Sequence, residues 1–449
     1  MAIQIIYLFT GGAICFFFVL FAFSSADERK PRAVVISVVM LIITAATWFI
    51  VYLLFSGSVS VLSTAVLLVV FVLILYFIPS GPRRVLHVGP IDVRVDERDV
   101  IFAREEYSPG SDKHRQYYAL RPDNRIIDDK LRGLPEFLKP GGRYYNPVRS
   151  RAVESMFTVI ENLGYKVDGE VNNKRVESDP VEMTVKIKEL AFGLGADDVG
   201  IASLNPMFVY SHVGRGPETW GSPIRNNHRY AIVFVLEMAY DSVEAAPGLS
   251  ITEESSRQYL KGAQLSISLA KQIRNLGYPA RAHIAGSNYQ IMLSPVAHDA
   301  GLGELGRIGY LISPKYGARV RLGAVTTDLP LLPDKSITFG VQDFCEKCLK
   351  CAVNCPSGAI PKGTKSLVRG VDKWPMQVEK CLGYWRRIGT DCGLCMKVCP
   401  FSHPPTLVHN LVRAGTRRSS FARTISVWGD DLFYGRKHDY DRSTDDSTV

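Results

Sequence analysis

The amino-acid sequence predicts an α+β protein in which an α/β sandwich carries a cysteine-rich insert and follows three N-terminal transmembrane helices. Three observations predict this architecture. The first 78 residues contain three long apolar runs, helical and strand-like stretches alternate from residue 181, and eight of the nine cysteines fall between residues 345 and 399. A chain of 449 residues is long enough to hold these parts and to bury a large core.

The apolar runs are residues 3–23, 33–55 and 59–78, and each can span a hydrocarbon core of about 30 Å. None contains Asp, Glu, Lys, Arg or His, and none has the polar face that a surface helix shows. No Lys or Arg precedes the first run, so we interpret it as a retained helix and not as a cleaved signal. The runs are expected to anchor the chain in a lipid bilayer but not to conduct electrons alone.

Positive charge follows the first and third runs, whereas the link between the second and third runs is uncharged. The charged residues are Arg29, Lys30, Arg32, Arg83 and Arg84. Basic flanks stay on the cytoplasmic side, so we expect a multi-pass protein of the inner (cytoplasmic) membrane with its large domain in the cytoplasm. The net charge of +9 suits anionic lipid headgroups. Nucleic acid is not expected as a partner, because the basic residues are dispersed and no binding motif accompanies them.

The soluble part begins with a polar, Arg-rich segment, residues 80–180, in which Pro and Gly are frequent. This composition predicts a loop-rich lead-in with few regular elements. Beyond it, the pattern predicts a helix at 181–194 and strands at 198–202 and 230–238. Such alternation indicates an α/β or α+β sandwich, which we place at residues 181–340.

A longer helix is predicted over residues 255–276, where apolar residues recur at helical spacing and Gly277 is placed as the C-terminal stop. Further along, Gly301, Gly303 and Gly306 imitate a dinucleotide-binding fingerprint. Their context argues against that function, because residues 295–300 indicate a short helix or loop and no complete βαβ unit surrounds the motif. The glycines still permit a close backbone approach to a large planar ligand.

The cysteines form two runs with the spacing of iron–sulfur ligands. The first is Cys345-x2-Cys348-x2-Cys351-x3-Cys355 followed by Pro356, and the second is Cys381 with Cys392-x2-Cys395-x3-Cys399 followed by Pro400. In two-cluster ferredoxins the last Cys of each such run ligates the other cluster. We therefore assign Cys345, Cys348, Cys351 and Cys399 to one [4Fe-4S] cluster, and Cys355, Cys381, Cys392 and Cys395 to a second.

Zinc would need only four ligands and would leave the Cys-x3-Cys-Pro endings unexplained, and disulfides are disfavoured in a reducing cytoplasm. Cys15, in the first apolar run, is expected to pack against apolar neighbours or lipid. Two clusters that share ligands imply delivery of single electrons to a buried acceptor. The cysteines alone do not identify that acceptor.

Several other motifs resemble those of the corrinoid-dependent reductive dehalogenases, over residues 181–440. They are Ile-Arg-Asn-Leu-Gly-Tyr at 273–278, Ala-Gly-Leu-Gly at 300–303, Pro-x-Tyr-Gly at 314–317, Val-Arg-Leu at 320–322, Thr-Asp-Leu-Pro at 327–330 and Asp-Leu-Phe-Tyr-Gly at 431–435. The resemblance implies a nitroreductase-like core that holds a base-off cobalamin, with the two clusters feeding electrons to cobalt. Gly286, Ser287, Asn288, Gly301, Gly303 and Gly306 are the expected corrinoid contacts.

By their places in these motifs, Tyr259 resembles the family's catalytic tyrosine and Arg321 its partner arginine. A carbon that loses halide needs a proton, and a guanidinium beside a phenol favours the phenolate, so the pair can act as an acid near neutral pH. The third polar residue of the family's site has no clean counterpart, because Ala285 falls where counting places it. His283, Ser287 or Asn288 are the alternatives. Exported respiratory members carry a twin-arginine signal and use a separate small anchor protein, whereas here the three apolar runs are expected to replace that anchor.

Five domains follow from these observations: a membrane anchor (1–79), the lead-in (80–180), the corrinoid-binding core (181–340), a ferredoxin-like domain with two clusters (341–403) and a C-terminal tail packed on the core (404–449). The expected function is reductive removal of halide from an organohalide. The electron donor is left open between a quinol-linked protein, a ferredoxin and a flavoprotein. The alternatives are an enzyme related to epoxyqueuosine reductase, and a non-catalytic membrane-bound electron-transfer protein.

Overall fold

The computed structural model describes residues 2–81, 93–177, 179–286 and 289–438. The chain forms two compact units. Unit 1 comprises Met1–Arg84, Phe339–Cys348 and His403–His438, and unit 2 comprises Val85–Thr338, Leu349–Ser402 and Asp439–Val449. The boundary passes through the cysteine-rich segment 345–399, because its first four residues belong to unit 1 and the remainder to unit 2.

Unit 1 contains the three apolar runs as helices α1 (Ala2–Asp27), α2 (Pro31–Phe55) and α3 (Val59–Phe77). All three are long and apolar enough to cross a membrane, as the sequence predicts. Most of their large apolar side chains are exposed, which fits contact with lipid. Three further helices complete the unit: α12 (Val341–Cys348), α16 (Leu407–Thr416) and α17 (Ser420–Tyr434).

The C-terminal helices pack on the membrane helices within unit 1, and the expectation that residues 404–449 pack on the corrinoid-binding core stays a prediction. The Ser419 hydroxyl donates to the Leu75 carbonyl oxygen at 2.8 Å, and the hydroxyls of Tyr76 and Ser426 are 3.1 Å apart. Gly415 lies so close to the ring of Tyr76 that an added Cβ would stand 2.0 Å from it. Hydropathy does not reveal these contacts, because they are made by hydroxyls and a glycine.

Unit 2 is built on a four-stranded antiparallel sheet of order β1-β2-β6-β3. The strands are β1 (Asp198–Ser203), β2 (Tyr230–Glu237), β6 (Val320–Thr327) and β3 (Ala280–His283). In β2, alternate residues Ile232, Phe234 and Leu236 enter one apolar core, while Ala231, Val233 and Val235 enter another. The sheet is therefore covered on both faces, which agrees with the continuous apolar sequence of β2.

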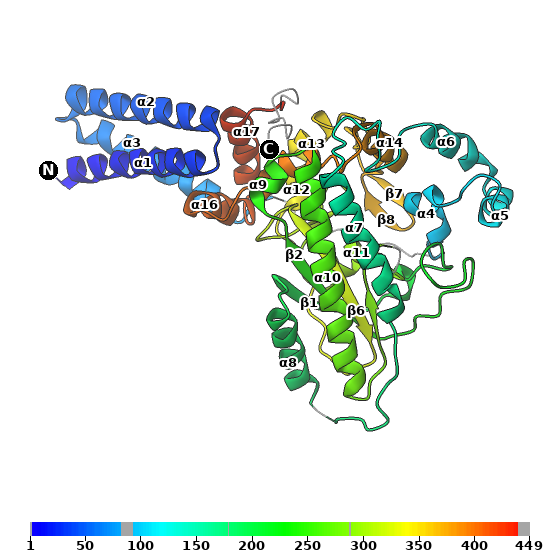
Figure 1. Cartoon of the computed structure of the whole chain (residues 1–449). Helices are drawn as coiled ribbons and strands as arrows, with labels where there is room; N and C mark the ends of the chain where they lie inside the picture. Colours follow the sequence, from blue (N-terminus) through cyan, green and yellow to red (C-terminus); the bar gives the residue numbers. More distant parts are fainter. Residues whose placement is uncertain (1, 82–92, 178, 287–288, 439–449) are drawn as a thin grey trace. The chain divides into compact units, whose positions relative to one another are not determined.

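Helices α7 (Arg149–Asn162), α8 (Pro180–Gly193) and α10 (Leu249–Asn275) contribute to the first core, and α11 (Leu293–Asp299) contributes to the second. Figure 1 shows α10 lying along the sheet with α7 beside it. The predicted elements are confirmed, although α10 begins six residues before residue 255. Its first turn buries Leu249 and Ile251 behind polar neighbours that hide the apolar stripe.

Segment 80–180 contains more helix than its composition predicts, so the expectation of few regular elements is wrong. Besides α7, the structure forms α4 (Ile101–Glu105), α5 (Asp112–Leu120) and α6 (Pro122–Arg132). Ser111 caps α5 by accepting from the His114 amide, and a buried ion pair of 2.6 Å joins Arg104 to Asp128. These helices depend on caps and ion pairs, which hydropathy does not detect.

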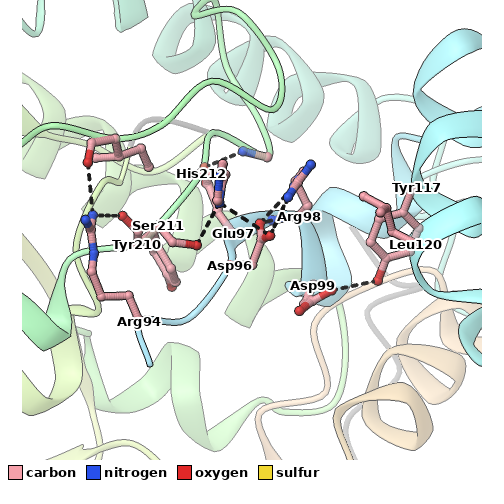
Figure 2. A network of polar contacts seen from close by, with 12 residues as sticks. Arg94, Asp96, Glu97, Arg98, Asp99, Tyr117, Leu120, Tyr210, Ser211 and His212 are labelled. Atoms are coloured by element: carbon pink, nitrogen blue, oxygen red, sulfur yellow. Dashed lines mark hydrogen bonds and ion pairs between the residues drawn. The ribbon is translucent and has the colours of Figure 1, made fainter. Parts of the chain in front are cut away.

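The lead-in is also fixed to the core by polar contacts (Figure 2). The Arg94 guanidinium donates to the carbonyl oxygens of Val209 at 2.9 Å and Ile224 at 3.1 Å. The Glu97 carboxylate accepts from the Gly214 amide at 2.8 Å and pairs with Arg215. Such contacts satisfy buried backbone groups where regular structure is sparse.

The remaining elements of unit 2 are short. They are the helices α9 (Tyr240–Glu244), α13 (Lys350–Val353), α14 (Val378–Ile388) and α15 (Leu394–Lys397), the paired strands β4 (Glu304–Leu305) with β5 (Leu311–Ile312) and β7 (Ser366–Val368) with β8 (Val371–Lys373), and 3-10 turns at Glu97–Asp99, Leu163–Lys166, Pro206–Phe208 and Pro400–Ser402.

Candidate active site

Tyr259 and Arg321, which the family resemblance singles out, lie together in unit 2. Tyr259 is on α10 and Arg321 is on β6, one of the two central strands of the sheet. The carbon of the Arg321 guanidinium is 5.2 Å from the centre of the Tyr259 ring. The positive group therefore stands where it can attract the ring and stabilise a phenolate.

Two residues that the sequence analysis missed hold this arginine in place. Arg321 Nη2 donates to the Ser255 hydroxyl oxygen at 2.7 Å, and that hydroxyl lies 2.8 Å from Asp391 Oδ2. Asp391 Oδ2 is also 3.7 Å from Arg321 Nη2. In the sequence, Ser255 stands one helical turn before Tyr259, and Asp391 directly precedes Cys392. This closeness to predicted site residues is the sequence signal that could have identified them.

The electrostatics of this group follow from its burial. Burial raises the pKa of the Asp391 carboxyl, which the Arg321 charge and the Ser255 hydrogen bond oppose. Burial lowers the pKa of Arg321. The negative charges that Tyr259 and Asp391 can carry raise this pKa by more than burial lowers it, so the net change is upward. Arg321 is therefore a fixed positive charge. Its Nε is buried and has no hydrogen-bond partner among the described residues.

Two further tyrosines line the same region. Burial raises the pKa of Tyr289 and of Tyr310 above the ordinary tyrosine value. Tyr310 interacts electrostatically with Cys381, Cys395 and Tyr259, yet 38% of its surface is accessible. The described residues thus leave open space beside this ring, although it lies among buried groups. Sequence reasoning gave no signal for either tyrosine.

The structure brings together the four cysteines assigned to the second cluster, Cys355, Cys381, Cys392 and Cys395. Burial raises the pKa of the Cys381 and Cys395 thiols to about 12 and that of Cys392 well above its ordinary value. Repulsion from neighbouring thiolates adds to each shift, and Cys355 acts on all three. Four converging thiolates would repel one another without a compensating cation, and this is the ligand set that an iron–sulfur cluster requires.

The turns Cys348–Cys351 and Cys392–Cys395 each begin with a residue in the left-handed conformation. Leu349, directly after Cys348, has a φ of 57°, and Gly393, directly after Cys392, has a φ of 62°. A leucine rarely adopts this left-handed conformation, so Leu349 is held there by its surroundings. In the second turn, backbone hydrogen bonds from Leu394 to Cys392, and from Cys395 and Met396 to the Cys395 sulfur, partly oppose the rise in the pKa values of these thiols.

The cysteines assigned to the first cluster belong to different units. Cys345 and Cys348 are on α12 in unit 1, whereas Cys351 on α13 and Cys399, just before the 3-10 turn Pro400–Ser402, are in unit 2. Their assignment to one cluster stays a prediction.

The expected corrinoid contacts are only partly described, because Ser287 and Asn288 lie outside the described residues. Gly286 has a φ of 71°. A Cβ added at Gly301 would lie 2.6 Å from the Lys335 carbonyl oxygen, and one at Gly303 would lie 2.2 Å from that of Ile312. One at Gly306 would lie 2.8 Å from the Ile312 side chain. Contacts within the chain therefore account for these three glycines, and their contact with a corrinoid stays a prediction.

His283, an alternative for the third polar residue, is fully buried in β3. Its Nε2 lies 2.9 Å from the Thr326 hydroxyl, and its Nδ1 accepts from the Gln290 amide at 3.2 Å. Burial lowers the pKa of His283 well below its ordinary value. Both ring nitrogens are thus occupied in a neutral core residue, and His283 is a poor candidate for the active site.

A family model described as a 4Fe-4S dicluster domain matches residues 344–403. The tetrachloroethene reductive dehalogenase of Sulfurospirillum multivorans is 33% identical over 295 residues, which cover 58% of this chain and 58% of that protein. The solved structure of a catabolic reductive dehalogenase in complex with 3-bromo-4-hydroxybenzoic acid matches with a TM-score of 0.64 and 29% identity, over 81% of this chain and 50% of that one. Over most of its length this chain is therefore similar to reductive dehalogenases.

Another reductive dehalogenase structure, reported to suggest a mechanism for B12-dependent dehalogenation, matches with a TM-score of 0.63 and 29% identity, over 80% of this chain and 50% of that one. The epoxyqueuosine reductase of Bacillus cereus is 34% identical over only 110 residues, or 23% of this chain and 28% of that protein. The similarity to reductive dehalogenases therefore extends much further along the chain. The chain spans about half the length of the reductive dehalogenases it matches.

Proposed function

We propose that this chain is a membrane-anchored reductive dehalogenase that uses two [4Fe-4S] clusters and a corrinoid. The reaction adds two electrons and one proton to an organohalide, breaks the carbon–halogen bond, forms a carbon–hydrogen bond and releases halide. The observation that carries this proposal is the Tyr259–Arg321 pair, which reaches the second cluster's cysteines through Asp391. Arg321 Nη1 also lies 3.9 Å from the sulfur of Met396, next to Cys395.

The cysteines are suited to hold the iron–sulfur clusters. Burial and mutual repulsion keep the second set of thiols from ionising alone, so bound iron is the charge that this site lacks. The clusters, when bound, supply one-electron transfer. Asp391 links the cysteine loop to Arg321 and gives the two sites a direct polar connection.

Two observations indicate that the site can hold a corrinoid. Arg321 Nε is a buried donor without a partner among the described residues, and Tyr310 retains accessible surface among buried groups. We propose that the macrocycle, in its base-off form, occupies this space within a nitroreductase-like core. A bound corrinoid supplies a reduced cobalt centre that donates electrons for breaking the carbon–halogen bond.

Tyr259 is the proposed proton donor. Its Oη gives the proton to the carbon that loses halide, and the phenolate left behind is stabilised by the Arg321 guanidinium. The hydrogen bond to Ser255 orients this guanidinium, and the Asp391 carboxylate keeps it from turning away. Tyr289, whose hydroxyl donates to the Leu322 carbonyl oxygen at 3.4 Å, is not required as an acid.

The relatives suggest the substrate class. Tetrachloroethene and 3-bromo-4-hydroxybenzoic acid, named for two of them, both carry halogen on an sp² carbon. We propose a vinyl or aryl halide for this chain, with a corrinoid site on the cytoplasmic side of the inner membrane. The connection between α1 and α2, where Glu28 lies, and the end of α3, where Tyr76 lies, both contact α16 and α17, so these ends share one side of the membrane.

The test is expression with corrinoid, followed by measurement of halide release from vinyl and aryl halides with a strong chemical reductant. Bound corrinoid and released halide are expected. A protein that binds iron but no corrinoid, and releases no halide from either class, would instead be the electron-transfer protein considered above.

A further inference from the structure

Unit 1 contains a largely buried polar cluster that the proposed reaction does not use. It comprises Glu28 at the end of α1, His403, His409 on α16, and Asp430 and Tyr434 on α17. Glu28 Oε2 lies 2.8 Å from His403 Nδ1, and His403 Nε2 lies 3.3 Å from Asp430 Oδ1. We call these three residues the Glu28–His403–Asp430 chain.

A second polar chain lies against the first. His409 Nδ1 is 3.3 Å from Glu28 Oε1, and its Nε2 is 3.1 Å from the Tyr434 hydroxyl. The rings of His403 and His409 are stacked, with centres 4.6 Å apart and planes inclined by 2°. Arg413 faces the same group, because its guanidinium donates to the His403 carbonyl oxygen.

This geometry does not suit a metal ion, although Glu28, His403 and His409 present potential ligand atoms within 4.8 Å of one another. An imidazole binds a metal in the plane of its ring, and a single ion cannot lie in two parallel planes that are stacked face to face. All four ring nitrogens also already have hydrogen-bonding neighbours. The arrangement instead resembles a path for protons.

The surroundings point to a lipid-soluble reactant that also supplies electrons. The same unit holds the three membrane helices and α12, which carries Cys345 and Cys348. Helix α12 packs on α17, where Arg423 Nε lies 2.5 Å from Asp343 Oδ2. Asp430 is seven residues further along α17, or about 10 Å at the rise of an α-helix. Helices α16 and α17 also expose Leu407, Leu411, Ile425 and Trp428, which suit the membrane interface.

We propose that the Glu28–His403–Asp430 chain accepts the protons of a membrane quinol whose electrons enter the iron–sulfur cluster that Cys345 and Cys348 help to hold. This inference rests on the proposed function and names its electron donor. Both quinol O–H bonds break, the two electrons leave singly to the clusters, and the product is the quinone.

Each proton has a defined destination. Asp430 takes the first from a quinol hydroxyl. Asp430 passes this first proton to Nε2 of a neutral His403, which releases its Nδ1 proton to Glu28 Oε2. Asp430 then takes the second proton from the quinol. Burial lowers the pKa of His403, but its hydrogen bonds and ion pairs with Asp430 and Glu28 raise it more, so the neutral ring readily accepts a proton at Nε2. His409 is neutral, because burial and the charges of His403 and Arg413 lower its pKa to about 2.

The test uses the full chain in lipid nanodiscs with its clusters reduced by dithionite. Decylubiquinone is added, and cluster reoxidation, which runs the proposed path in reverse, is followed by absorbance. We expect His403→Gln and the isosteric Asp430→Asn each to slow reoxidation by about 10²-fold. Ferricyanide, which needs no proton path, should reoxidise every variant at the wild-type rate and so report intact clusters. The matched control is His212→Gln, which changes a histidine of unit 2 and should react normally.

Wild-type rates with decylubiquinone in both variants would overturn the inference, as would stoichiometric zinc bound by the wild type and lost in both variants. Halide release driven by a strong chemical reductant separates this result from the proposed function. That release should be unchanged in both variants. If it is absent from the wild type while quinone still reoxidises the clusters, the dehalogenase proposal fails and the quinol site stands.

Discussion

The guanidinium carbon of Arg321 lies 5.2 Å from the centre of the Tyr259 ring, and the same arginine is hydrogen-bonded to Ser255, one turn earlier on the helix of Tyr259. A strand and a helix thus fix the positive group against the phenol. Because the strand is central to the sheet and the helix is packed along it, neither residue depends on a surface loop for its position.

Removal of the Tyr259 hydroxyl tests its role as the acid. We expect Tyr259→Phe to lower the rate of halide release by about 10²-fold or more, because the proton donor is lost while the ring remains. Iron and corrinoid contents should not change. Tyr289→Phe is the matched control, since it removes a nearby buried phenol with no proposed part in proton transfer. Equal losses in the two variants would contradict the assignment.

Replacement of Arg321 by lysine tests whether the shape of the guanidinium matters. Lysine keeps the charge but lacks the planar fork that contacts both the Tyr259 ring and Ser255. We expect Arg321→Lys to reduce halide release by about 10-fold or more and to shift its pH profile to higher pH, because the phenolate is less stabilised. A pH–rate profile of the variant measures both effects, and wild-type values in each would exclude the proposed pairing.

Replacement of Cys355 tests whether the last cysteine of one run binds the cluster of the other run. We expect Cys355→Ser to lose about half of the bound iron and the spectral signal of one cluster, since it supplies the fourth ligand to the cluster of the other run. Cys381→Ser should give the same loss, and the double variant no greater one. The control is Cys15→Ser, in α1, which should retain all iron. Additive losses in the double variant would show that the two cysteines serve different clusters.

Glu105 provides a test of stability against pH. Burial raises the pKa of its carboxyl from 4.5 to about 7, although Arg386 opposes the shift. A raised pKa means that the stability present below pH 4.5 is lost as the pH rises through 7, at a cost of up to about 3 kcal/mol. We expect Glu105→Gln to raise the melting temperature at pH 8 and to leave it unchanged at pH 4.5. A melting temperature that falls at pH 8 would show that the ion pair with Arg386 outweighs burial.

The sequence predicted the elements whose pattern is set by burial. The membrane helices and strand β2 follow from hydropathy, because their environments impose a continuous or alternating apolar pattern. The helices of the lead-in were missed, because caps and ion pairs such as Arg104–Asp128 hold them. The contacts between the C-terminal helices and the membrane helices were also not predicted, because hydroxyls such as Ser419 form them.

The candidate site, too, was only partly predicted from the sequence. Spacing predicted the second cluster's four cysteines, which the structure brings together, and family motifs predicted the proximity of Tyr259 and Arg321. Ser255, Asp391 and Tyr310 were not predicted. They reach the site from separate parts of the chain, and only the tertiary fold brings them near one another.

The most direct test of the whole account is the cobalt content of the purified full-length protein after reconstitution with a corrinoid, measured together with its iron. We expect stoichiometric cobalt that stays with the protein through gel filtration. Iron at full occupancy with no retained cobalt would contradict it.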